Sequence, residues 1–190
     1  QKSQSLLWAT ILTLICGLSI YIGWFVGVCI QQKHRLLMRI LLSFSAGTMI
    51  YLSLAVLWMQ LNALSIGLWI GGFVVLLVLN KILHAQGKLT ITALVIHNIP
   101  ESFVVFSTAM MNVWLGLLLA VTVICHNLPL GCGLALPESM KSKKQQCYRA
   151  LFTGIAPAFL AILMYLFLRS MLSMEYLIHL SALAGGMMLY

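Results

Sequence analysis

The chain has 190 residues, of which 62% are hydrophobic and only 7% are charged, and its formal net charge is +8. Soluble domains carry about 25% charged residues, so the 3 acidic and 11 basic side chains of this chain cannot cover a water-exposed surface. This composition excludes an ordinary cytosolic enzyme, a disordered tail and a coiled coil, and it predicts an all-α, polytopic membrane helix bundle.

Apolar runs of membrane-spanning length follow one another along the whole chain. A span with its loop takes about 25 to 27 residues, so the length accommodates about seven helices. In chain order, we predict spans at about 5–30, 39–61, 63–83, 89–111, 113–137, 148–169 and 174–190. They form a single transmembrane domain, 1–190. Because the last span is cut short, we interpret the chain as trimmed from a longer protein.

The charge of the predicted loops alternates along the chain. The loops after the first, third and fifth spans hold most of the basic residues, namely Lys33, Arg35, Arg39, Lys81, Lys88, Lys141, Lys143, Lys144 and Arg149. The loops near Asn62 and Asn112 carry no charge. Because cytoplasmic loops carry the excess of Lys and Arg, we predict a cell (plasma or inner) membrane protein with its N-terminus outside. The basic surplus is a topology signal, so the expected partner is the lipid bilayer and not a nucleic acid.

Three ionisable side chains lie inside spans four and five: His97, Glu101 and His126. Such groups are costly in hydrocarbon and mark a functional site by default. His97 and Glu101 are four residues apart and share one helix face. The element His-Asn-x-Pro occurs twice, at 97–100 and at 126–129.

The depths of the two histidines are predicted to match. His97 lies about 12 Å from the cytoplasmic start of its span, and His126 about 20 Å from the outer start of its own. In a hydrocarbon core of about 30 Å these depths nearly coincide, so the two imidazoles and Glu101 can meet. Two His and one carboxylate suit Zn²⁺ or a similar divalent ion, and Asn98 and Asn127 could add carbonyl oxygens.

Other interpretations of these residues need no metal. A histidine in a membrane helix can simply bond to a neighbouring helix, and His97 with Glu101 could form an ion pair or a proton relay. The double motif at matching depth favours the metal site. A second repeat relates residues 46–51 in span two to residues 185–190 in span seven, which run in opposite directions. This pattern is typical of an inverted repeat, and its small residues favour close helix packing.

With these motifs the chain resembles a known family, the ZIP (Zrt/Irt-like) metal transporters. Residues 97–101 (HNIPE) are similar to that family's signature in span four, and residues 126–129 (HNLP) stand where the family repeats it in span five. Residues 44–47 and Ser53 resemble its second span, and residues 184–190 its seventh. The likeness covers essentially the whole chain.

The resemblance implies eight helices, with both termini outside and an inverted repeat around spans four and five, so that an eighth span would follow Tyr190. It implies inward transport of a divalent metal, zinc above all and also iron, manganese or cadmium, as cargo and not as a cofactor. The number of subunits stays open, with a homodimer among the options. By position, the family's metal ligands fall on five residues: His97, Asn98, Glu101, His126 and Asn127.

The chain departs from the family pattern where further acids are expected. Leu130 replaces a Glu of span five, Pro157 a Glu of span six, and Val56 an acid of span two. These losses favour one metal site over two. They also keep a second function open, that of a transport-impaired relative acting as a metal sensor or as a regulatory or assembly partner. An intramembrane metal enzyme is disfavoured, because the sequence has no H-E-x-x-H and no further carboxylate to serve as a general base.

Overall fold

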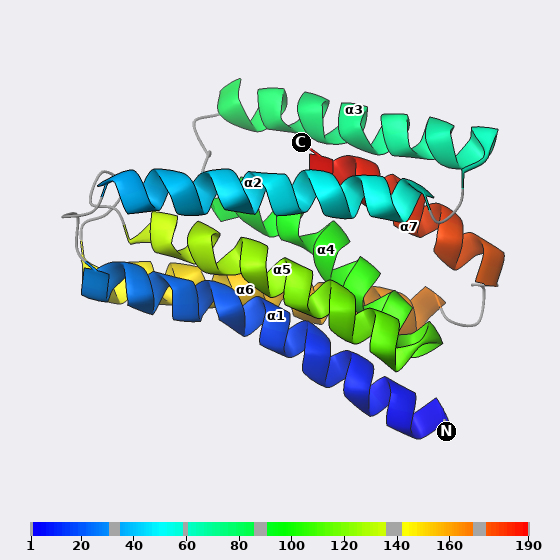
Figure 1. Cartoon of the computed structure of the whole chain (residues 1–190), viewed down its shortest axis with the longest axis horizontal. Coiled ribbons are helices and arrows are strands. Elements are labelled where there is room, and N and C mark those ends of the chain that lie inside the picture. Colours follow the sequence, from blue (N-terminus) through cyan, green and yellow to red (C-terminus); the bar gives the residue numbers. More distant parts are fainter. Residues whose placement is uncertain are drawn as a thin grey trace.

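The computed structural model describes residues 2–30, 35–58, 61–85, 91–135, 142–168 and 174–189. Within these residues the chain forms seven helices and no strand, so the predicted all-α class is confirmed. All seven lie roughly along one long axis (Figure 1). Their bounds are α1 Lys2–Ile30, α2 Arg35–Trp58, α3 Ala63–Ala85, α4 Ile91–Met111, α5 Val113–Leu134, α6 Lys143–Leu168 and α7 Met174–Leu189.

Six of these helices, α1 to α6, are long and apolar enough to cross a membrane. The described part of α7 has 16 residues, or about 24 Å of helix. Helices are the form that apolar segments can take in lipid, because every backbone N–H and C=O is then satisfied within the segment. Three of them, α4, α5 and α6, stay helical through an internal proline.

Asparagine side chains start two of the helices. Asn112 Oδ1 accepts hydrogen bonds from the backbone N–H groups of Trp114 and Leu115, at 2.9 and 3.3 Å. Asn62 Oδ1 accepts one from Ser65 N–H at 2.7 Å. Each side chain satisfies N–H groups that have no partner within the helix. The two uncharged connections of the sequence are therefore helix caps.

Several basic residues lie in helices, where the sequence predicted loops. Lys143, Lys144 and Arg149 belong to the first two turns of α6, and Arg39 lies within α2. Lys and Arg are good helix formers, and their long side chains can reach the polar interface from a helix end. Lys33, Lys88 and Lys141 lie outside the described residues.

Exposed aromatic side chains gather at the end of the bundle where α1, α3, α5 and α7 begin, on the right in Figure 1. Trp8, Trp58, Trp114 and Tyr176 are all exposed there, on four different helices. Trp and Tyr are enriched where a membrane meets water, because their rings are apolar and their polar atoms need a wet partner. These four side chains fit a bundle that ends at the headgroup level.

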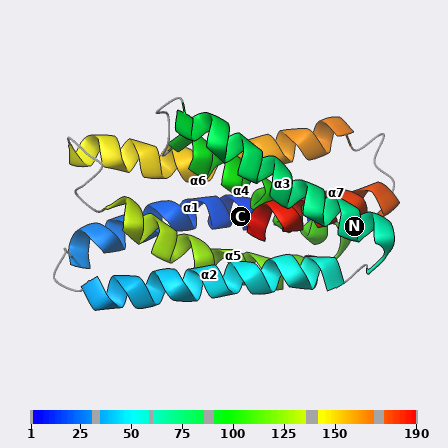
Figure 2. The same cartoon turned by 90° about the horizontal axis from the view of Figure 1, so that it is seen from above.

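α4 is the most enclosed of the six long helices. Its residues Phe103, Val104, Val105 and Phe106 are each at most 4% exposed. α1 packs against α4, α5 and α6, whereas α3 packs mainly against α7. Figure 2 shows α2 and α6 on opposite sides of the bundle, with α1 and α5 between them. The two proline motifs therefore lie in the interior of the bundle and not on its lipid face.

α1 and α6 cross closely at a pair of glycines. Gly17 and Gly154 face each other, and a Cβ on Gly154 would lie 2.0 Å from the carbonyl oxygen of Gly17. α1 also meets α5 through glycine, because a Cβ on Gly131 would lie 2.1 Å from the carbonyl oxygen of Ile20. Glycine lets these backbones touch, as is common between membrane helices.

The glycines in the two copies of the second predicted repeat differ in how closely another helix approaches them. A Cβ on Gly186 would lie 1.8 Å from the carbonyl oxygen of Trp69, so α7 packs closely against α3 there. Gly47 on α2 has nothing within 4 Å of a Cβ. The expectation of close packing is confirmed at Gly186 and is wrong at Gly47, because that face of α2 is exposed.

Candidate metal centre

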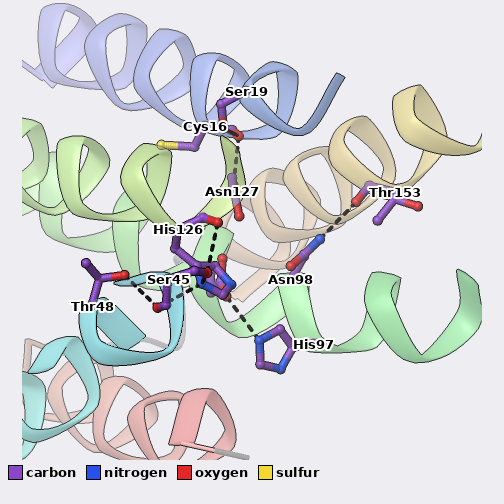
Figure 3. A network of polar contacts seen from close by, with 10 residues as sticks. Cys16, Ser19, Ser45, Thr48, His97, Asn98, His126, Asn127 and Thr153 are labelled. Carbon is purple, nitrogen blue, oxygen red and sulfur yellow. Dashed lines mark hydrogen bonds and ion pairs between the residues drawn. The ribbon is translucent and has the colours of Figure 1, made fainter. Parts of the chain in front are cut away.

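The side chains of His97, Glu101 and His126 meet in the interior of the bundle, as their predicted depths required. His97 and Glu101 come from α4 and His126 from α5, and the two imidazole rings lie 6.0 Å apart between centroids. One potential ligand atom of each residue lies within 4.8 Å of the other two. We call these three residues the His/Glu cluster. Figure 3 shows the two histidines facing each other from α4 and α5.

The distances within the His/Glu cluster are close to those of a zinc site. Glu101 Oε1 lies 3.4 Å from His97 Nε2 and 3.5 Å from His126 Nε2. A tetrahedral Zn²⁺ with bonds of about 2.0–2.1 Å holds neighbouring ligand atoms about 3.3–3.4 Å apart. Two of the three ligand-to-ligand edges therefore have the required length before any ion is added. The fourth tetrahedral position would stay open.

Among the described residues, most potential ligand atoms of the cluster make no hydrogen bond. Both carboxylate oxygens of Glu101 and Nε2 of His126 are buried and have no hydrogen-bond partner among the described residues. Buried polar atoms are almost always paired, so three unpaired ones at one point call for an explanation. A cation bound between the three side chains would supply it. The His97 side chain keeps 21% of its surface exposed, against 1% for Glu101, so it is the exposed member of this pair.

A serine of α2 holds the far side of the His126 ring. Ser45 Oγ lies 2.6 Å from His126 Nδ1, and the Ser45 hydroxyl donates to the His126 carbonyl oxygen at 3.1 Å. The Ser45 carbonyl in turn accepts a hydrogen bond from the Thr48 hydroxyl at 2.7 Å. Figure 3 shows this chain of contacts leading from α2 to the ring. His126 is therefore held on its Nδ1 side, while its Nε2 side faces Glu101.

The two motif asparagines make matching contacts in opposite halves of the bundle. Asn98 on α4 donates from Nδ2 to the carbonyl oxygen of Thr153 on α6, at 3.3 Å. Asn127 on α5 donates to the carbonyl oxygen of Cys16 on α1, at 2.9 Å (Figure 3). Each acceptor immediately precedes one of the crossing glycines, Gly154 and Gly17. The hydrogen bond that joins α4 to α6 thus has a counterpart that joins α5 to α1.

These contacts give the asparagines a structural use that the sequence did not predict. Their amide nitrogens tie the motif helices to α6 and α1, while both Oδ1 atoms stay buried without a hydrogen-bond partner among the described residues. A carbonyl oxygen of this kind can still accept a water or face a cation. Coordination by Asn98 and Asn127 remains a prediction.

Sequence reasoning did not assign Ser45 to the site. The only signal was a small polar residue within the span-two resemblance, and serines that merely bond their own helix are common in apolar spans. Ser107 and Ser181 do so here, each donating to the carbonyl oxygen four residues earlier. Only the packing of α2 against α5 distinguishes Ser45 from them.

A second group, at the starts of α3 and α7, is weaker as a cation site. Glu175 and His179 line a cavity of about 570 Å³ with Asn62, and His179 Nδ1 is buried without a partner among the described residues. His179 is half-buried. The N-termini of two helices lie at this cavity, and their positive dipole ends oppose a cation.

Comparison with known proteins gives the chain relatives along nearly its whole length. It is 30% identical to the zinc transporter ZupT of Salmonella arizonae over 207 residues, which cover 94% of this chain and 80% of the relative. It is 29% identical to the ZupT of Chlorobium luteolum, covering 96% of this chain and 84% of the relative. The ZupT of Escherichia coli O7:K1 is 29% identical, with coverages of 94% and 80%. The chain belongs to the ZIP family.

No protein-family model matches the chain, and neither does any solved structure. As a ZIP protein, the chain is an integral membrane transport protein and not an enzyme. The positions where it departs from the ZIP pattern carry no acid. Val56 is buried against Gly185, Pro157 is buried within α6, and Leu130 stands one turn after His126 on α5. Among the described residues, Glu101 is thus the one carboxylate inside the bundle.

Proposed function

We propose that this protein transports divalent metal cations, zinc above all, through a single intramembrane site formed by His97, Glu101 and His126. The observation that carries the proposal is the meeting of these side chains, with ligand atoms within 4.8 Å of one another. The relatives support the choice of zinc, because those compared are named zinc transporters. Two imidazoles and one carboxylate also suit iron, manganese or cadmium.

Transport requires that the ion leave as readily as it binds. One carboxylate balances only half of the charge of a divalent ion, so the site holds zinc less tightly than one with several acids. The open fourth position lets a water stay on the ion, which eases ligand exchange. Asn98 and Asn127 lie beside the cluster and could contribute their free carbonyl oxygens.

The proposed direction is inward. Metal would enter from the side of the uncharged connections and leave toward the basic loops, which the distribution of Lys and Arg assigns to the cytoplasm. The site lies between the two halves of the predicted inverted repeat. In transporters built this way, one part of the bundle rocks against the other and opens the site to each side of the membrane in turn. The ion is cargo in this scheme, and no bond in it is made or broken.

Zinc uptake into proteoliposomes loaded with a fluorescent chelator tests the proposal. We expect uptake by the unmodified protein and its loss in the His97→Ala and Glu101→Ala variants, because each removes one of three ligands. Circular dichroism and gel filtration of both variants control for folding. Unchanged uptake by a folded Glu101→Ala protein would show that the metal does not pass through the His/Glu cluster.

A second function rests on the missing acids. With Leu130, Pro157 and Val56 in place of carboxylates, the protein would bind metal without moving it and act as a sensor or as a regulatory or assembly partner. In that case the purified protein binds zinc but shows no uptake, and the double substitution Leu130→Glu with Pro157→Glu creates uptake. Strong uptake by the unmodified protein would exclude this function.

A further inference from the structure

The two histidines of the His/Glu cluster are held in different ways. His126 has two acceptor atoms of one residue on its Nδ1 side, Ser45 Oγ at 2.6 Å and Ser45 O at 3.3 Å. The Ser45 carbonyl oxygen can only accept a hydrogen bond. His97 makes one polar contact among the described residues, that of its Nε2 with Glu101. The ring of His126 is therefore held by hydrogen bonding at Nδ1, which leaves Nε2 facing Glu101, whereas His97 has no such partner on its Nδ1 side among the described residues.

One arrangement of the protons satisfies all three contacts between Ser45 and His126. The Ser45 hydroxyl has one proton, and it donates this proton in a hydrogen bond to the His126 carbonyl oxygen, 3.1 Å away. The hydroxyl oxygen is then an acceptor toward Nδ1, so Nδ1 carries the ring proton of a neutral imidazole. The opposite arrangement would direct the Nδ1 lone pair at the Ser45 carbonyl oxygen. It would also place an Nε2–H 3.5 Å from Glu101 Oε1, too far for a good hydrogen bond.

We infer that Ser45 is a positioning residue for the metal, which fixes His126 in the Nδ1–H tautomer and so presents the Nε2 lone pair to the ion. The inference rests on the proposed function, because it takes the His/Glu cluster as the zinc site. Ser45 belongs to α2 and His126 to α5, so the contact also ties a helix that supplies no ligand to the metal-binding face. Partners of this kind typically change metal affinity by about 10–100-fold.

Ser53 offers a matched control on the same helix. Like Ser45 it is buried and makes two hydrogen bonds, donating to the Gly185 carbonyl oxygen at 2.6 Å and accepting from Trp69 Nε1 at 3.0 Å. Neither partner belongs to the His/Glu cluster. Ser53→Ala therefore removes a comparable contact of α2 without touching a proposed ligand.

The tautomer can be measured without metal. In the protein reconstituted in lipid nanodiscs with ¹⁵N-labelled histidine, we expect the His126 ring, assigned by its absence in His126→Gln, to show a protonated Nδ1 and an unprotonated Nε2. Ser45→Ala keeps only the backbone carbonyl oxygen, at 3.3 Å, as an acceptor for Nδ1–H, so the fraction of rings protonated at Nε2 should rise. Ser45→Thr should keep the proton on Nδ1. A protonated Nε2 in the unmodified, metal-free protein overturns the inference, whether or not any variant folds.

Zinc binding supplies the second readout. By titration calorimetry with Zn²⁺, Ser45→Ala should weaken binding about 10–100-fold, Ser45→Thr should restore most of it, and Ser53→Ala should change it less than about twofold. Equal losses for both serines, with the tautomer unchanged, would reduce Ser45 to a helix-packing role and overturn the inference. Normal zinc binding by Glu101→Gln and His126→Gln would instead remove the proposed site itself.

Discussion

At the residue scale, the histidines and the glutamate of the two motifs differ from the asparagines in their hydrogen bonding. The His/Glu cluster combines buried, unpaired ligand atoms with spacings near 3.4 Å. Asn98 and Asn127 follow the histidines in sequence, and they donate hydrogen bonds from their side-chain amides to the backbone carbonyls of Thr153 and Cys16. One motif therefore supplies both a member of the His/Glu cluster and a contact with another helix, because adjacent residues of a helix point about 100° apart.

Glu101→Gln should abolish most zinc binding by the purified protein. Glutamine has nearly the same size but no charge, so the ion loses its only anionic ligand among the described residues. Loss of a supporting partner alone costs about 10–100-fold, so the loss of this ligand should exceed about 100-fold in titration calorimetry. Glu175→Gln, which changes an exposed acid at the start of α7, is the control and should bind normally. A shift of less than tenfold for Glu101→Gln contradicts the assignment.

At the element scale, α1 and α6 are in direct backbone contact at their crossing. The crossing at Gly17 and Gly154 places backbone against backbone, and the acceptor carbonyls of Cys16 and Thr153 precede these glycines directly. Any widening of the crossing therefore pulls on the two motif helices as well. We therefore expect the packing of α1 to affect the geometry of the His/Glu cluster through these two hydrogen bonds.

Gly154→Ala should destabilise the bundle and weaken zinc binding together. The new Cβ would lie 2.0 Å from the Gly17 carbonyl oxygen, a backbone atom, so the helices must separate, and overpacking of this kind costs about 1–3 kcal/mol. The measurement is reversible unfolding in detergent micelles, with a zinc titration of the same samples. Gly67→Ala is the control, because a Cβ there has nothing within 4 Å. A Gly154→Ala protein as stable as the Gly67→Ala protein would show that the crossing is looser than described.

At the scale of the whole molecule, the two ends of the bundle differ in chemistry. One end carries the exposed aromatics Trp58, Trp114 and Tyr176 together with the uncharged caps at Asn62 and Asn112. The basic residues of α6 lie at the start of a helix that begins at the other end (Figure 1). This asymmetry is the physical basis of the proposed orientation and of the proposed inward direction.

Cysteine labelling should reveal this orientation. In a background from which the five native cysteines have been removed, Leu61→Cys should react with a membrane-impermeant maleimide in intact cells. Lys144→Cys should react only after the cells are permeabilised. Both side chains are exposed at opposite ends of the bundle, so access is set by the membrane and not by burial. The reverse pattern of labelling would invert the topology and, with it, the proposed direction.

Hydropathy and local spacing were enough to predict the membrane bundle and the approximate helices, because a span depends on its own apolar residues and on the closure of backbone hydrogen bonds within it. The site was also largely predictable. His97 and Glu101 share a face through their spacing of four residues, and the depth of His126 follows from the same helical rise. Helix ends were less predictable, because Lys143 and Arg149 can extend a helix as well as occupy a loop.

The lateral arrangement of the helices could be decided only by the tertiary structure. Gly17 and Gly154 are 137 positions apart, and Ser45 and His126 are 81 positions apart. No local pattern marks such pairs, since glycine and serine occur in many apolar helices without a close neighbour, as Gly47 does. Sequence alone therefore predicted a metal centre at mid-membrane, formed by residues of the fourth and fifth spans. Packing decided which groups hold its ligands, because that depends on which faces of distant helices meet.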